Sequence, residues 1–149
     1  MTAAAYLLDT DCLSAASPVA GDGADVFRRW IAANGERLFL SPVSLAEVAY
    51  GVARLVQRGA VRKAALLQAW SDDVLTFHET RILALDAAIG RRTGQLLAVA
   101  QAHGVEPSFE DAAIAATAEH HGLTVLTRNL RHFVPMGVAC LDPVTELPD

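Results

Sequence analysis

The chain has 149 residues, of which 52% are apolar and 19% charged, and its formal net charge at pH 7 is −5. A chain of this length can bury a substantial hydrophobic core, and the apolar content excludes an intrinsically disordered protein. Its two cysteines, Cys12 and Cys140, are too few for a disulfide framework. The default expectation is therefore a reducing, cytoplasmic setting.

Neither a targeting segment nor a membrane segment is expected. The first nine residues have no basic flank and no long apolar run, unlike a signal peptide. The alanine-rich stretch 83–102 contains Asp86, Arg91 and Arg92. These charges favour a helix of a soluble protein over a membrane span.

The net negative charge argues weakly against nucleic-acid binding, because proteins that bind nucleic acids usually carry a basic surface. The argument depends on where the acids lie, since Mg²⁺ bound at a cluster of acids would offset part of the excess. Eleven of the twelve basic residues are arginine, which suits forked contacts with phosphate. The basic pairs at 62–63 and 91–92 are expected on solvated helix faces. Net charge therefore does not decide the function.

Hydrophobic periodicity predicts short strands that alternate with helices. Short apolar runs bounded by polar residues predict strands, whereas apolar residues at helical spacing predict helices. Gly104 and Gly122 suit the C-terminal ends of two helices. In chain order, we expect a strand at 3–8, a helix at 22–33, a strand at 37–41, helices at 44–56 and 61–70, a strand at 74–77, helices at 83–103 and 111–121, and strands at 123–127 and 137–141.

This alternation, without a hairpin signal between adjacent strands, is typical of βαβ units. We therefore expect an α/β fold, with a central parallel sheet of four to five strands flanked by helices on both faces. The sequence shows no internal repeat, low-complexity tract or interdomain linker. A single domain over residues 1–149 accounts for the pattern.

Acidic side chains follow the predicted strands at the positions where parallel sheets gather functional groups. Asp9 ends the first strand, Glu47 lies one turn into the helix after the second, and Asp111 opens the helix before the strand at 123–127. Carboxylates that converge repel one another unless a cation offsets them. Oxygen ligands without His or Cys favour Mg²⁺ or Mn²⁺ over zinc. Such a metal polarises a phosphoryl oxygen and activates water for attack on phosphorus.

Each acid except Asp9 also has a structural explanation. Ser44 and Glu47 fit a capping box, in which the glutamate reaches back to the first amide of the helix. Asp111 fits a first-turn acid that complements the helix dipole. Asp11 fits a helix N-cap or a supporting role beside the site. Asp9 ends a fully apolar strand and has no such explanation in the neighbouring sequence.

Four segments resemble, in order and spacing, the motifs of PIN-domain proteins along essentially the whole chain. None is specific alone, but the four together are. They are YLLDTDCLS at 6–14, SLAEVAYG at 44–51, DAAIAATA at 111–118, and GLTVLTRN at 122–129 followed by Phe133. In particular, the chain is similar to VapC-type toxins, the ribonuclease halves of prokaryotic toxin–antitoxin pairs.

The resemblance implies a PIN-like fold and Mg²⁺- or Mn²⁺-dependent endonucleolytic cleavage of RNA. It also implies neutralisation by a small antitoxin bound across the active site, commonly around a toxin homodimer. Carried over, Asp9, Glu47 and Asp111 become the acidic catalytic triad and the metal ligands, with Asp9 and Asp111 the first choice. The chain departs from many PIN domains at two positions: Asn129 replaces the fourth acid, and His132 stands where an acid often precedes the final Phe. Thr127 and Asn129 remain candidates for orienting the phosphate or a water molecule.

Two rival interpretations also fit part of the sequence. Asp9 and Asp11 match the start of the nucleophile loop of haloacid-dehalogenase-like phosphatases, with Asp9 as the nucleophile. That family has Thr or Val at the position where this chain has Leu13. It also requires a lysine near the site, whereas the single lysine of this chain, Lys63, falls in a predicted amphipathic helix. The other rival is a catalytically weakened PIN-like module that only binds a partner, which the missing fourth acid favours and the intact triad opposes.

Overall fold

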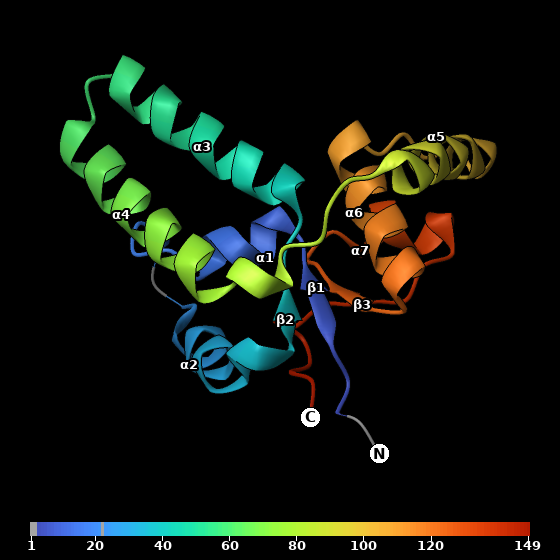
Figure 1. The fold of residues 1–149 in the computed structure, drawn as a ribbon, viewed down its shortest axis with the longest axis horizontal. Helices are drawn as coiled ribbons and strands as arrows, with labels where there is room; N and C mark the ends of the chain where they lie inside the picture. The colour runs from blue at the N-terminus through green and yellow to red at the C-terminus, as the bar shows by residue number, and fades with distance from the viewer. Residues whose placement is uncertain (1–2, 22) are drawn as a thin grey trace.

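The computed structural model describes residues 3–21 and 23–149, and these form a four-stranded parallel sheet with helices on both faces (Figure 1). The strand order is β2-β1-β3-β4, so β1 is an inner strand. The strands are β1 (Tyr6–Leu8), β2 (Leu38–Phe39), β3 (Thr124–Leu126) and β4 (Cys140–Leu141). The predicted fold class is confirmed.

Seven α-helices and three 3₁₀ turns connect these strands in the described ranges. The α-helices are α1 (Thr10–Ala15), α2 (Asp25–Asn34), α3 (Pro42–Gln57), α4 (Val61–Phe77), α5 (Ala87–Ala102), α6 (Phe109–His121) and α7 (Leu130–Phe133). The 3₁₀ turns are Gly35–Arg37, Glu79–Arg81 and Val134–Met136. The predicted helix at 22–33 corresponds to α2, and its first predicted residue, Asp22, lies outside the described residues.

Alternate residues of each strand point to opposite faces of the sheet and enter two separate cores. Leu7 and Val125 pack with α5 and α6 on one face. Tyr6, Leu8 and Leu126 pack on the other face, with side chains from α1 to α4. Burial on both faces explains why these strands are apolar runs without a polar alternation.

The α3–α4 hairpin projects from the sheet as an arm, and α5 and α6 lie on the other side of the molecule (Figure 1). Helix α6 is buried through residues 112–118, where five of the seven side chains are alanine. Small side chains let neighbouring elements approach this helix closely. None of the helices in the described residues combines the length and the hydropathy needed to cross a bilayer.

One predicted element is wrong. Residues 74–77 do not form a strand; they are the last turn of α4, which runs unbroken from Val61 to Phe77. Leu67, Trp70 and Val74 lie at helical spacing and pack against the same core, and no Gly or Pro interrupts the helix between them. Beyond β2, the one further parallel pairing among the described residues is an isolated bridge between Leu40 and Ile82.

Candidate active site

Asp9 and Thr127 lie side by side at the carboxyl edge of the sheet because of the register of β1 and β3. Leu8 pairs with Leu126, so the next residue of each strand is brought to the same level. Asp9 is 4% exposed. Its Oδ2 accepts a hydrogen bond from the Thr127 hydroxyl at 2.8 Å, and its Oδ1 accepts one from the Thr10 amide at 2.8 Å. Asp9 is therefore held rigidly where β1 gives way to α1.

Glu47 reaches this edge from the second turn of α3. The Thr10 hydroxyl donates to Oε1 of Glu47 at 2.8 Å and lies 3.0 Å from Oγ of Ser44. The capping-box interpretation of Glu47 is wrong, because α3 begins at Pro42 and its N-cap is Ser41, whose hydroxyl accepts from the Val43 amide. The Glu47 carboxylate is thus turned toward α1 and not toward the first amides of its own helix.

Asp111 lies in the first turn of α6, as predicted, but its side chain contacts another segment. Ser108 caps the helix by accepting from the Asp111 amide at 3.1 Å. Oδ2 of Asp111 lies 2.8 Å from Nδ1 of His132, and that nitrogen lies 2.7 Å from Nδ2 of Asn129. These contacts tie α6 to α7 and to Asn129, the residue that precedes α7.

Asp11 supports the same edge from α1. It is not the N-cap of that helix, since Asp9 has that position. Oδ2 of Asp11 accepts from the Arg128 amide at 3.1 Å, which anchors the chain after β3. Oδ1 of Asp11 is buried and has no hydrogen-bond partner among the described residues. An unpartnered buried carboxylate oxygen is costly unless a cation or a donor reaches it.

The electrostatics of the edge favour a bound cation. The pKa of Asp9 is raised to about 7, mainly by burial and also by the charges of Asp11 and Asp111, and the hydrogen bonds from Thr127 and Thr10 oppose this shift. Partial burial also raises the pKa of Glu47, and the charges of Glu110, Asp111 and Asp11 add to it. Like charges thus face one another at this edge, and within residues 3–21 and 23–149 no lysine or arginine forms an ion pair with these acids.

The residues present fit a hard divalent metal by their chemistry, although no three His, Cys, Asp or Glu side chains of the described residues already meet as a metal site. The donors at the edge are carboxylate oxygens, which suit Mg²⁺ or Mn²⁺. Oε2 of Glu47 and Oδ1 of Asp111 accept no hydrogen bond within residues 3–21 and 23–149. Within that part of the chain, no hydrogen bond to these two oxygens would have to break for either to bind a metal.

The sequence did not reveal the roles of Thr10 and His132. Thr10 joins Asp9 to Glu47, and His132 joins Asp111 to Asn129. Thr10 directly follows the strand-end acid, and this position was the available signal. The sequence marks His132 only as the replacement of an acid, and nothing near it in the sequence identifies Asp111 as its neighbour.

This protein is therefore an α/β protein with an acidic site at the carboxyl edge of its parallel sheet. Residues 6–134 match the family model described as PIN domain. The chain belongs to the PIN-domain family.

Similar proteins agree with this assignment. The chain is 34% identical over 108 residues to Toxin FitB of Neisseria gonorrhoeae, covering 72% of this chain and 76% of that protein. It is 30% identical over 138 residues to a VapC ribonuclease of Sinorhizobium fredii, covering 92% of this chain and 96% of that protein. The solved structure of FitAB bound to a DNA fragment superimposes with a TM-score of 0.81 at 30% identity, covering 93% of this chain and 95% of that one. The family match favours a nuclease over the phosphatase alternative.

Proposed function

We propose that this protein is a Mg²⁺- or Mn²⁺-dependent endoribonuclease and the toxin of a type II toxin–antitoxin pair. The observation that carries the proposal is the state of Asp9: a buried carboxyl at the end of the inner strand β1, its pKa raised to about 7 by burial and by neighbouring acids. The similarity to a protein named as a toxin and to one named as a ribonuclease supports it.

In this proposal Asp9, Asp111 and Glu47 hold the metal and form the catalytic triad. Thr127 and Thr10 hold Asp9, and Thr10 also holds Glu47. Asn129 contributes a neutral amide where an acid is usual in the family, and Asp11 fixes the Arg128 backbone beside it. When bound, the metal polarises the phosphoryl group and lowers the pKa of water. The chain itself supplies the alignment of the acids and the burial of Asp9.

The test of this activity uses the purified chain and RNA. We expect cleavage of a defined single-stranded RNA with Mg²⁺ or Mn²⁺, none after EDTA treatment, and recovery when the metal is restored. Fragment analysis on a denaturing gel separates internal cuts from digestion at the ends. Cleavage that persists in EDTA would contradict the metal role. An absence of cleavage with intact partner binding would favour the binding-module alternative.

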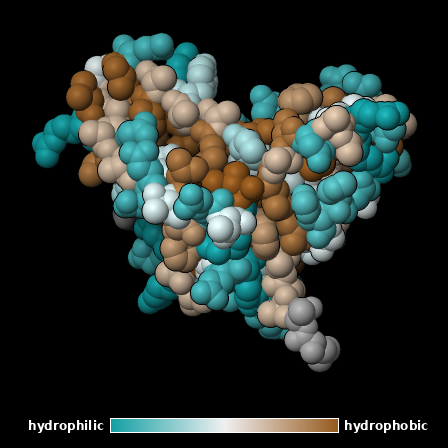
Figure 2. All heavy atoms as spheres, viewed as in Figure 1, coloured by the Kyte–Doolittle hydropathy of each residue, from teal (hydrophilic) through white to brown (hydrophobic). Residues whose placement is uncertain are grey.

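We also propose a small antitoxin as the partner and a homodimer as the toxin's assembly. Apolar side chains are exposed along the α3–α4 arm, where Figure 2 shows hydrophobic surface, and exposed apolar patches are typical of protein interfaces. They include Tyr50, Val56, Val61 and Leu66, each more than half exposed. Co-purification of the chain with the product of a short upstream reading frame tests the antitoxin proposal. The molecular mass in solution tests the homodimer proposal.

Thr127→Val is expected to lower the cleavage rate about 10- to 100-fold, the usual cost of losing a group that orients a ligand. The change removes the donor to Asp9 and also the hydroxyl that accepts from the Asn129 amide at 2.9 Å. Thr127→Ser keeps the hydroxyl and is the matched control. Rates at saturating metal and RNA, with melting temperatures of each variant, give the result; equal rates for the two variants would remove the assigned role.

A further inference from the structure

A polyanionic substrate cannot approach this acidic edge without nearby cations. The chain carries a net charge of −5, and the acids whose charges act on one another gather at the edge: Asp9, Asp11, Glu47, Glu110 and Asp111. One metal ion offsets only part of that charge. Phosphates on either side of the cleaved bond would still be repelled unless the protein supplies its own cations there.

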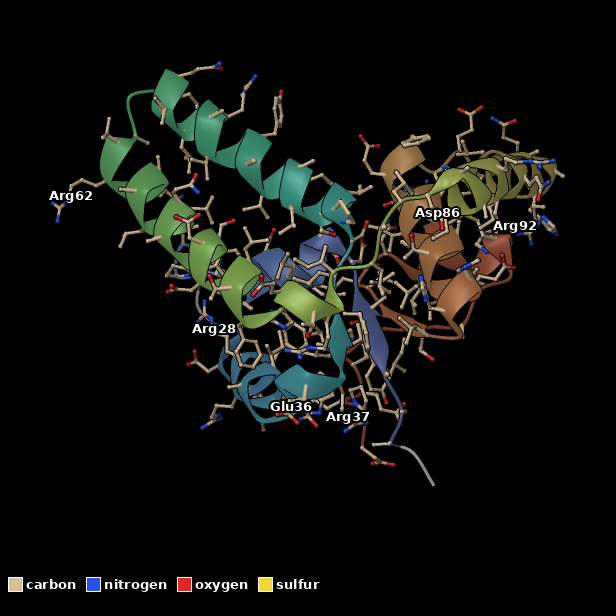
Figure 3. All side chains as sticks on the ribbon, in the orientation of Figure 1. Arg28, Glu36, Arg37, Arg62, Asp86 and Arg92 are labelled. Carbon is tan, nitrogen blue, oxygen red and sulfur yellow. The ribbon has the colours of Figure 1, made fainter. Side chains whose placement is uncertain are left out.

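Several arginines already have other roles. Arg92 forms a forked ion pair with Glu119 at 2.6 and 2.9 Å, Arg28 pairs with Asp25, and Arg37 binds backbone carbonyl oxygens. Figure 3 shows Arg92 on α5 and Arg37 near the chain ends, both away from the carboxyl edge of the sheet. Arg62 extends into solvent at the outer end of the arm (Figure 3).

Arg128 stands at the acidic edge. Its amide donates to Asp11, and Arg128 is among the residues that line a cavity of about 500 Å³. The wall of that cavity is mostly apolar and includes Phe27 and Val144. Within the described residues the Arg128 guanidinium makes no hydrogen bond or ion pair. An apolar wall beside an available guanidinium suits a nucleotide, with the base on the wall and the phosphate at the arginine.

Arg131 stands beside the other end of the acidic cluster. With His132 it lines a second cavity of about 550 Å³, which also includes Gln101 and Glu106. His132 contacts Asp111, so this cavity adjoins the α6 side of the cluster, whereas the first adjoins Asp11 on α1. The two cavities share no lining residue. Three residue steps separate the arginines, so their Cα atoms lie at most about 11 Å apart, a distance that a few nucleotides span.

We infer that Arg128 and Arg131 bind the RNA phosphates on the two sides of the cleaved bond, one in each cavity, with the acidic cluster between them. The inference rests on the proposed ribonuclease function and assigns its substrate-binding residues. Each arginine then holds a different part of the same strand. The same five-residue segment, 128–132, also carries Asn129, so substrate binding and the alignment of the acidic site are coupled through one stretch of chain.

The experiment measures binding of a short single-stranded RNA in an Asp9→Asn background, across a series of salt concentrations. Each lost phosphate contact is expected to lower the slope of log affinity against log salt by about 0.7. We expect this for Arg128→Gln and for Arg131→Gln, and about twice the loss for the double variant. Arg62→Gln removes the same charge at the outer end of the arm and is expected to leave the slope unchanged.

Oligonucleotides shortened at one end give the second readout. With Asp9 intact, shortening the RNA on one side of the cut is expected to cancel the effect of one arginine variant on KM, and shortening the other side to cancel the effect of the other. Equal slopes for all single variants, or variants that respond identically to both truncations, would overturn the inference. If the wild-type chain cleaves RNA while these results fail, only this inference falls; if it neither binds nor cleaves RNA, the proposed function fails with it.

Discussion

Asp9→Asn is expected to lower metal-dependent RNA cleavage by at least about 100-fold while the protein stays folded. An amide keeps the shape of the side chain but removes the charge that a divalent ion requires. The Thr127 hydroxyl can still donate to the amide oxygen, so the edge of the sheet keeps a contact. Binding of the antitoxin should persist, because no surface residue changes. Cleavage rates and antitoxin affinity, measured on the same preparations, give the result.

Asp73→Asn is the matched control for this variant, since Asp73 is exposed on α4 and far along the chain from the acidic edge. It makes the same chemical change and should leave both measurements unaltered. Unchanged cleavage by Asp9→Asn would reject the mechanism. Loss of antitoxin binding together with cleavage would point to misfolding, which a melting curve detects directly.

The metal-free protein is expected to lose stability as pH rises from about 4 to about 7. Asp9 has a pKa of about 7 in the folded state against 3.8 for an ordinary aspartate, so the folded state holds a proton that the unfolded state releases in this window. The contribution of Asp9 to the free energy of unfolding is fully present below its unfolded-state pKa of 3.8. It is lost as the pH rises to the folded-state pKa of about 7. The expected loss is about 1.4 kcal/mol per pH unit, and the raised pKa of Glu47 acts in the same direction. Denaturant unfolding across the range, in EDTA, measures it.

A bound metal should reverse this dependence. Mg²⁺ binds the charged carboxylates, so at pH 7.5 it is expected to stabilise the folded protein, by about 2.7 kcal/mol when its concentration is 100 times the dissociation constant. Asp9→Asn should flatten the pH dependence and reduce the stabilisation by metal, whereas Asp73→Asn should change neither. A wild-type protein whose stability is independent of both pH and Mg²⁺ would contradict the electrostatic account of the site.

The sequence predicted the parts of the site that depend on strand ends. Asp9 follows an apolar run that can only be a buried strand, and parallel strands present their carboxyl ends at one edge. Neither inference needs knowledge of tertiary contacts. The position of Thr127 beside Asp9 required the register of β1 and β3, which no local pattern encodes.

Errors arose where a local pattern had two solutions. Residues 74–77 are apolar and fit a strand, but α4 continues through them because Trp70 and Val74 reach the same core on one helical face. Ser44 and Glu47 fit a capping box, but Pro42 starts the helix one position after Ser41. In both cases tertiary packing and the neighbouring proline decided the outcome.

The attachment of Asp9 to the inner strand limits how this protein can be controlled. The Asp9 amide donates to the Leu126 carbonyl at 2.9 Å, between strands whose side chains fill both cores. Local opening of such a strand costs nearly as much as global unfolding, so this amide should be among the slowest to exchange with deuterium. A regulator therefore cannot inactivate the site by opening β1 locally, because that opening requires nearly the free energy of global unfolding. Control has to come from outside, by a molecule that covers the edge and leaves the sheet as it is.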